Sequence, residues 1–244
     1  MQYNQHLEDL LKKIESNHYV GLGNLNAKIL FIGKEPGVEV GSEIYDGTAR
    51  SWSEKQFDYS KSYIPPKKSS IRNLNHTWQR YQKLYDLILQ NLNIHQGYQK
   101  KDKYEISFIE NVFTTELSNL HAKTTFEAKQ HENFAAELEK RKKILFRSNF
   151  ISQFPIVVIF ANDNQYIETY PGEVCELFKV KFDGLHDYSG KDKIWVHSAV
   201  SESQPKLLIH TRQLTNSISS ELIKNLALLI TEFIQKNLPC QIVI

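Results

Sequence analysis

Residues 29–37 read ILFIGKEPG, an apolar run that passes directly into Gly, a charged pair, Pro and Gly. A continuous apolar run is typical of a strand buried on both faces, as in parallel sheets covered by helices. Pro36 fixes its own φ, and it favours an extended backbone at the residue before it. The stretch therefore predicts a buried strand with Glu35 held in an extended conformation at its tip, in a turn bracketed by Gly33 and Gly37.

Strands and helices alternate along the rest of the chain. Apolar runs predict strands at 27–32, 106–114, 154–162, 193–198 and 206–211. Helical spacing predicts helices at 4–16, 78–92, 126–147, 172–178 and 217–236, the last capped by Asn216 or Ser217. This alternation is typical of an α/β three-layer sandwich with a central, mainly parallel four-stranded sheet flanked by helices. We expect one domain spanning residues 1–244.

Composition excludes several classes of protein. The 244 residues are 41% hydrophobic and 24% charged, which favours a globular core over disorder. Cys175 and Cys240 form no C-x-x-C pair, so no structural zinc or iron–sulfur site is expected. The N-terminus has no apolar leader and no long apolar run follows, so a cytoplasmic, membrane-free chain is expected. We assume a monomer and expect neither a metal nor an organic cofactor.

A basic stretch stands out although the net charge is only +2. Residues 65–83, PPKKSSIRNLNHTWQRYQK, contain five cations and no acid, with Trp78 and Tyr81 between them. Cations bind phosphates and aromatic rings stack on bases, so the stretch indicates nucleic-acid contact through Lys67 and Lys68. The alternative is a solvated loop followed by a helix whose aromatic residues face the core.

Polar groups follow most of the predicted strands. Ligands of open α/β sheets bind beyond the carboxyl ends of the strands. The segments GKEPG, ENVFTTELSN, ANDNQ and HTRQLT occupy these places in the prediction. Three of them present polar groups suited to chemistry, so we expect a functional site at these strand ends.

Three of these segments resemble motifs of the uracil-DNA glycosylase superfamily. Gly33 to Gly37 is similar to its first motif, an apolar strand that ends in a Gly-, Pro-containing turn with an acidic or amide residue. The stretch LLIHTRQLT is similar to its C-terminal histidine motif, with His210 as the histidine and Leu214 as the leucine that enters the duplex. ISFIENVFTTEL is similar to the strand that ends in a base-reading asparagine, here Asn111.

This resemblance implies a DNA glycosylase that hydrolyses the N-glycosidic bond of a flipped uracil-type or other damaged base. Glu35 and His210 would be catalytic, stabilising charge on the sugar and on the departing base. The base would be bound by Asn111, Trp52, Gly33 and Gly37, with Phe113 and Tyr45 as competitors for the stacking position of Trp52. DNA would be contacted by Lys34, Arg212, Leu214, Lys67 and Lys68.

The sequence also departs from the motifs of the superfamily. Lys34 stands beside the proposed catalytic carboxylate, Glu35 is one methylene longer than the usual Asp, and Gly37 replaces a tyrosine that excludes larger bases. Thr211, Arg212 and Gln213 replace a Pro, a Ser and a second Pro, which leaves the histidine segment less rigid. The resemblance therefore does not imply strict specificity for uracil.

Structural alternatives exist for each of these residues. Glu35 can pair with Lys34, His210 and Leu214 can be core residues, Asn111 can cap its strand, and Trp52 can anchor a loop. At the level of function, the alternative is a non-catalytic nucleic-acid or nucleotide-binding protein on the same fold. A more distant one is a hydrolase of free nucleosides or nucleotides.

Overall fold

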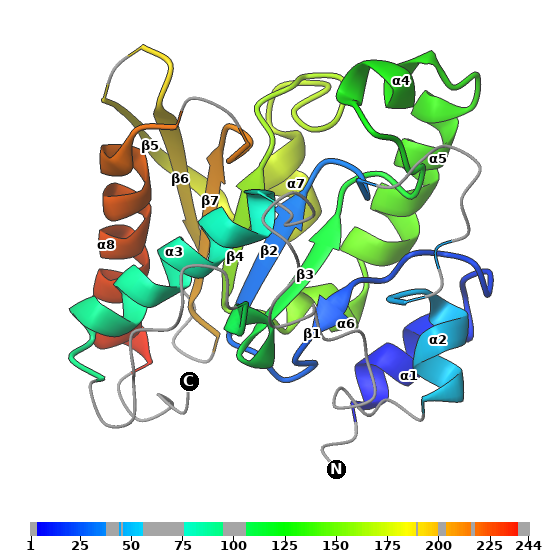
Figure 1. Cartoon of the computed structure of the whole chain (residues 1–244), viewed down its shortest axis with the longest axis horizontal. Coiled ribbons are helices and arrows are strands. Elements are labelled where there is room, and N and C mark those ends of the chain that lie inside the picture. The colour runs from blue at the N-terminus through cyan, green and yellow to red at the C-terminus, as the bar shows by residue number, and fades with distance from the viewer. Residues whose placement is uncertain are drawn as a thin grey trace.

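A seven-stranded mixed sheet forms the centre of the computed structural model (Figure 1). The structure describes residues 4–37, 44, 46–55, 76–94, 106–188, 190–199, 204–215 and 218–238. The strand order is β1-β3-β2-β4-β7-β6-β5. The strands are β1 (Leu22–Gly23), β2 (Ile29–Gly33), β3 (Val112–Glu116), β4 (Ile156–Phe160), β5 (Lys181–Asp187), β6 (Lys193–Ala199) and β7 (Lys206–Thr211).

Helices cover both faces of this sheet. One face packs against α3 (His76–Asn91) and α8 (Ser220–Asn237). The other face packs against the remaining α-helices and the π-helical turn η4. They are α1 (Gln5–Leu11), α2 (Ala49–Glu54), α4 (Thr125–Gln130), α5 (Phe134–Arg141), η4 (Lys142–Phe146), α6 (Asn149–Ser152) and α7 (Glu173–Phe178). The 3-10 helix η3 (Phe108–Glu110) packs on the α3 side of the sheet, where Phe108 and Ile109 belong to the core.

The period of two residues in the strands divides the core between the two faces. In β2, Leu30 and Ile32 belong to the core under α1 and α6, whereas Ile29 and Phe31 belong to the core under α3 and α8. All five residues of β2 are buried, as the apolar run predicts. The α/β class and the central sheet flanked by helices are therefore confirmed.

The predicted four-stranded, mainly parallel sheet is wrong in its number of strands and in its mixed character. Four neighbouring strands, β3, β2, β4 and β7, are parallel, and β1, β6 and β5 add antiparallel strands at the two edges. Strand β5 was not predicted because its sequence, KFDGLHD, lies almost entirely exposed and so carries no pattern of burial.

Two other predicted elements differ in their bounds. The strand predicted at 106–114 is β3, which begins only at Val112 because residues 108–110 form a 3-10 turn. The helix predicted at 126–147 is divided, since His131 has extended backbone angles that end α4. Ser219, rather than Asn216 or Ser217, caps α8, and the latter two lie outside the described residues.

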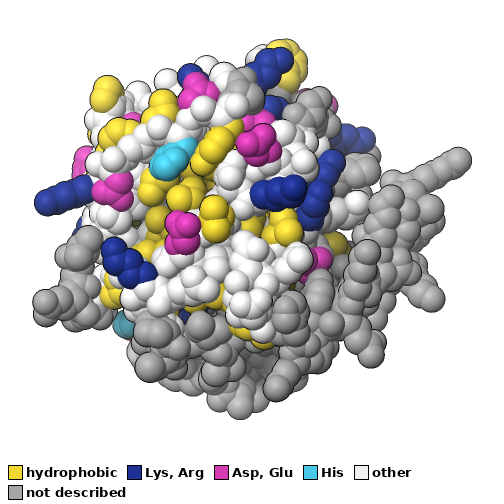
Figure 2. Space-filling model, turned by 90° about the vertical axis from the view of Figure 1, so that its left-hand side faces the viewer, with side chains coloured by type: hydrophobic (Ala, Val, Ile, Leu, Met, Phe, Trp, Pro, Cys, Tyr) yellow, Lys and Arg dark blue, Asp and Glu magenta, His cyan; other side chains and the backbone are white. Residues whose placement is uncertain are grey.

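The edge formed by β5 and α8 carries exposed apolar side chains. Phe182 is 54% exposed and Leu185 is 47% exposed, both on β5. Figure 2 views this side of the molecule and shows hydrophobic side chains around a histidine, with charged side chains around them. None of the described helices is both long enough and apolar enough to cross a lipid bilayer.

Candidate functional site

Glu35 lies just beyond the carboxyl end of β2, as predicted, and its backbone is fixed by the segment that follows β3. The carbonyls of Gly33 and Lys34 accept hydrogen bonds from the N–H groups of Leu117 and Ser118, at 2.9 and 2.7 Å. The carbonyl of Pro36 accepts from the N–H of Ala122 at 3.2 Å. The turn is thus held as an extension of the β2–β3 ladder, which positions the Glu35 side chain.

The two oxygens of the Glu35 carboxylate have different environments. Oε1 accepts a hydrogen bond from the Thr125 hydroxyl, in the first turn of α4, at 2.8 Å. Oε2 is buried and has no hydrogen-bond partner among the described residues. A buried carboxylate oxygen without a donor is unfavourable, so this atom is suited to accept a hydrogen bond from water or a ligand.

Glu116, at the carboxyl end of β3, lies next to this carboxylate. It is paired in register with Gly33, whose lack of a β-carbon leaves room for the Glu116 carboxyl. Burial raises the pKa of Glu116 well above its usual range, and the charge of Glu35 raises it further. The protonated form of Glu116 is therefore favoured, and in that form its carboxyl can donate a proton or a hydrogen bond.

Tyr166, in the segment after β4, provides a second neutral donor. Its side chain is buried, and its hydroxyl lies near the Glu35 carboxylate but makes no well-formed hydrogen bond to a described residue. Burial raises the pKa of Tyr166, and the negative charge of Glu35 is the next cause. The hydroxyl thus stays protonated close to Glu35.

Two lysines and an aspartate form an ion-pair cluster at the same strand ends. Lys34 Nζ lies 3.4 Å and Lys129 Nζ 2.5 Å from the same oxygen, Oδ2, of Asp163. Both ammonium groups also lie over the ring of Tyr166, at 5.3 and 5.7 Å from its centroid. Burial raises the pKa of Asp163, but the hydrogen bond from Lys129 and the charge of Lys34 outweigh this and hold it below its usual value. The described residues thus pair Lys34 with Asp163 rather than with Glu35.

His210 belongs to a different cluster. It lies within β7, where its Nε2 is hydrogen-bonded to the carbonyl of Ala161, and its ring stacks on Trp195 with centroids 5.0 Å apart. Burial lowers the pKa of His210 to about 4, so the ring is neutral and Nε2–H is the donor to this carbonyl. Strand β4 separates β7 from β2, and His210 lines a cavity to which Glu35 does not contribute.

Asn111 lies at the opposite end of β3 from Glu116. It ends the 3-10 turn before β3, and its neighbour Val112 pairs with Ile29 at the start of β2. Because a strand rises about 3.3 Å per residue, the length of β3, roughly 13 Å, separates Asn111 from the strand end that carries Glu116. The structure therefore does not bring Asn111 to Glu35, since the strand begins later than its sequence pattern predicts.

Trp52 and Leu214 are core residues in this structure. Trp52 is 1% exposed; its Nε1–H donates to the carbonyl of Gly21 at 2.9 Å, and its ring packs against Phe113. Leu214 is fully buried in the core under α3 and α8. A residue that stacks on a base or enters a duplex must be reachable, so the predicted roles of both residues disagree with this packing, as does that of the buried competitor Phe113.

The other residues that were predicted to contact the base or DNA do not share one environment. Arg212 forms an ion pair with Asp192 at 3.4 Å. Gly37 borders open space, since a β-carbon added there would meet no atom within 4 Å. Lys67, Lys68 and Tyr45 lie outside the described residues.

Sequence reasoning missed Glu116, Tyr166 and Thr125. Glu116 belongs to the segment VFTTEL, and it would have been found if the strand had been predicted to end there rather than at Thr114. Tyr166 lies one residue beyond ANDNQ, the segment expected to contribute to the site after the third predicted strand. Thr125 had no signal of its own, because only the fold brings the start of α4 to Glu35.

Comparison with known proteins assigns no family. No protein-family model matches the chain, and no curated protein is significantly similar to it. Within the ranges that the structure describes, no group of three or more His, Cys, Asp or Glu side chains is arranged to hold a metal ion.

Proposed function

We propose that the strand-end site around Glu35 hydrolyses the N-glycosidic bond of a flipped uracil-type or other damaged base in DNA. The observation that carries this proposal is the Glu35 carboxylate, which is fixed through Oε1 by Thr125 while the buried Oε2 has no donor. A hydrolytic water bound to Oε2 would satisfy this atom and be oriented by it. The proposed substrate class follows from the resemblance of the sequence motifs, of which the segment 33–37 lies at this site.

The neighbours of Glu35 suit this reaction. Water attacks the anomeric carbon as the bond to the base breaks, so positive charge develops on the sugar and negative charge on the base. Glu35 stabilises the sugar and accepts the proton of water, whereas neutral Glu116 and Tyr166 are the available donors to the departing base. A carboxyl group whose pKa is raised by its environment, as that of Glu116 is, can serve as the acid beside a carboxylate base in one site.

Among the catalytic residues, this assignment differs from the resemblance at His210. The superfamily motif would give the departing base to His210, but the Nε2–H of His210 is already bonded to the Ala161 carbonyl. Glu116 and Tyr166 therefore take that role in the proposal. DNA remains the proposed partner, with Lys67 and Lys68 as predicted phosphate contacts.

The experiment follows base release from labelled oligonucleotides. Single- and double-stranded substrates containing uracil, hypoxanthine, xanthine or hydroxymethyluracil are incubated with the protein, and alkali-sensitive breaks are counted. We expect cleavage by the wild type and a loss of about a hundredfold or more in Glu35→Gln, since a positioned general base contributes about this much. Glu132→Gln, an exposed carboxylate outside the site, is the matched control and should cleave normally.

Other outcomes would contradict the proposal in distinct ways. Equal cleavage by Glu35→Gln and the wild type would remove Glu35 from the mechanism. No cleavage of any oligonucleotide, with DNA binding that weakens as salt rises, would favour the non-catalytic binding protein. Activity on free nucleosides without affinity for DNA would replace the polymer by a small-molecule substrate.

A further inference from the structure

The cavity lined by His210 has a volume of about 420 Å³ and lies between α7, β6 and β7. Its walls include the rings of Phe182, Trp195, His197 and His210, and neither Glu35 nor Glu116 lines it. The rings are already paired: Trp195 stacks on His210, and Phe182 contacts His197 with centroids 5.4 Å apart. Its volume falls within the range of small-molecule sites, which are also mostly lined by apolar and aromatic groups.

His197 lines this cavity and carries a buried polar atom without a partner among the described residues. The residue is only 5% exposed, and its Nδ1 lies 3.6 Å from the sulfur of Cys175 on α7. Its other ring nitrogen, Nε2, is buried and has no hydrogen-bond partner among the residues described. A buried nitrogen without a partner is unfavourable, and a ligand atom that hydrogen-bonds to it removes this cost.

The contact with Cys175 indicates which nitrogen of the His197 ring carries the proton. The backbone N–H of Phe182 donates to the Cys175 sulfur, which leaves the thiol hydrogen free to donate to His197 Nδ1. We therefore assign the proton of the neutral ring to Nε2, where it is available to a ligand. The ligand atom that faces Nε2 is then an acceptor, such as a carbonyl oxygen or a ring nitrogen.

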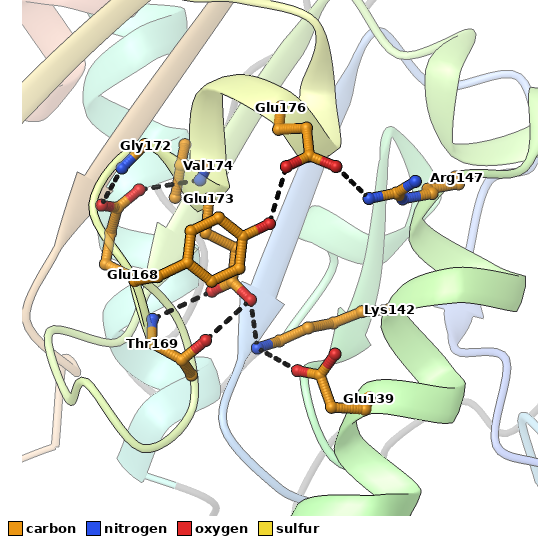
Figure 3. Close-up of polar contacts among 10 residues, drawn as sticks. Glu139, Lys142, Arg147, Glu168, Thr169, Gly172, Glu173, Val174 and Glu176 are labelled. Atoms are coloured by element: carbon orange, nitrogen blue, oxygen red, sulfur yellow. Dashed lines mark hydrogen bonds and ion pairs between the residues drawn. The ribbon is translucent and has the colours of Figure 1, made fainter.

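The cavity carries almost no free charge. Among the described residues that line it, none is Lys or Arg. The one carboxylate among them, Glu168, accepts hydrogen bonds from the N–H groups of Gly172 and Val174 at 3.0 and 2.7 Å (Figure 3). Burial lowers the pKa of His197 and raises the pKa of the Cys175 thiol, so both are neutral at pH 7. An anionic ligand would lose its hydration here without gaining a cation.

We propose that this cavity is a binding site for an uncharged, planar heteroaromatic molecule with an acceptor that bonds to His197 Nε2–H. The rings of Trp195 and Phe182 offer apolar surface to such a molecule, and the amides of Asn162 and Asn164, which are exposed at the cavity, offer donors and acceptors to its edge. This site is separate from Glu35, so the inference goes beyond the proposed function and does not depend on it.

The test measures binding of two matched pairs of probes to the whole chain, by calorimetry and by tryptophan fluorescence. Nicotinamide and adenine are uncharged, whereas nicotinate and adenosine monophosphate add a negative charge to the same rings. We expect saturable binding of at least one uncharged probe and affinity about tenfold or more lower for its charged partner. Absence of binding of either uncharged probe at millimolar concentration would overturn the proposal, and so would equal affinity for the two members of each pair.

Substitutions of His197 locate the site. His197→Phe removes the unpartnered nitrogen but keeps an apolar ring, so it should fold and should bind the uncharged probe about tenfold more weakly, the effect of one lost hydrogen bond of about 1.4 kcal/mol. His197→Gln places an amide near the position of Nε2 and should recover part of the affinity. Glu176→Gln, on the part of α7 that faces Arg147 rather than the cavity, should bind as the wild type does (Figure 3). Unchanged affinity in His197→Phe would overturn the proposal, whatever the oligonucleotide assay shows for Glu35.

Discussion

The carboxyl group of Glu116 occupies the space that a β-carbon on residue 33 would fill. An ideal β-carbon at Gly33 would lie 2.1 Å from Glu116 Oε2, closer than any non-bonded contact allows. The two residues are paired in register across β2 and β3, and Gly33 lies two residues before Glu35 in the chain. Gly33 therefore acts on the site through the position of a neighbouring acid, not through an unusual backbone conformation.

Gly33→Ala should reduce activity much more than stability. The added methyl group displaces the Glu116 carboxyl, but that group is the end of a flexible side chain, so we expect a loss of about 1 kcal/mol or less in the free energy of unfolding. Base release should fall about tenfold or more, because a donor moves away from the departing base. Urea unfolding and the oligonucleotide assay measure the two effects.

Gly37→Ala is the matched control for this substitution. It adds the same methyl group to the same turn, where no atom of the described residues lies within 4 Å, and should leave the position of the Glu116 carboxyl and the free energy of unfolding unchanged. If Gly33→Ala retained full activity, the carboxyl of Glu116 would have no part in the reaction.

The pKa of Glu116 predicts a pH-dependent gain in stability for Glu116→Gln. Because the folded protein holds the Glu116 pKa above its ordinary value of 4.5, the unfolded chain releases this proton first as pH rises. As pH rises above 4.5, the free energy of unfolding of the wild type therefore falls, by at most about 1.4 kcal/mol per pH unit. The fall ends once the pH passes the pKa of Glu116 in the folded protein. Glutamine cannot ionise and removes this loss.

Urea unfolding at about pH 5 and about pH 8 measures the effect, within the range where most proteins are stable. The difference in unfolding free energy between Glu116→Gln and the wild type should become more favourable to the variant as pH rises. Glu132→Gln, at an exposed position, should show no such trend. A difference that stayed constant with pH would mean that Glu116 titrates normally in the folded protein.

The sequence predicted those parts of the fold that depend on local pattern. β2 and β4 are continuous apolar runs because both of their faces are covered by helices, and the Gly-Pro turn correctly placed Glu35 at a strand end. β5 carries no such pattern because it is an edge strand with both faces exposed. The predicted bounds of β3 were wrong because the apolar residues before Asn111 belong to a 3-10 turn, whereas those after it belong to the strand.

The composition of the site depended on contacts between segments distant in sequence. Glu35 and His210 both follow from strand-end motifs, yet the strand order places β4 between their strands. The partners that Glu35 does have, Thr125, Glu116 and Tyr166, lie 81 or more residues further along the chain, and no local pattern relates them to it. Strand order and register, not residue type, decide which side chains meet.

Arg141 should contribute strongly to the free energy of unfolding through its hydrogen bonds beside the site. Its buried guanidinium donates to the carbonyl of Glu116 at 2.8 Å and to the Thr115 hydroxyl at 2.9 Å, and it also contacts the carbonyl of Tyr19. Burial lowers the pKa of Arg141 to about 9, which leaves it charged at pH 7. Arg141→Met leaves these buried acceptors without a donor and should cost about 3 to 5 kcal/mol.

Thermal or urea unfolding measures this cost against Arg147→Met. Arg147 is 51% exposed in its ion pair with Glu176, so its loss should cost less than about 1 kcal/mol. Equal effects of the two substitutions would show that the hydrogen bonds of Arg141 add nothing beyond an exposed ion pair.

The buried ion pair between Lys142 and Glu173 should show strong coupling in a double-mutant cycle. Its atoms lie 2.6 Å apart, and the two side chains are 4% and 3% exposed (Figure 3). Lys142→Met leaves the Glu173 carboxylate buried without its cation and should cost about 3 to 5 kcal/mol. Glu173→Gln should cost less, because Lys142 keeps Glu139 at 3.1 Å and Gln can still accept from Thr169. The double variant should therefore lose less stability than the two single losses added together.

The exposed pair Arg147–Glu176, which joins the same two helical segments, provides the reference cycle. Its side chains are 51% and 55% exposed, so solvent screens their attraction and the coupling energy should be about 1 kcal/mol or less. Urea unfolding of the single and double variants gives both coupling energies under one set of conditions. Equal coupling energies for the buried and the exposed pair would mean that water reaches Lys142 and Glu173. The start of α7 would then not be packed tightly against η4.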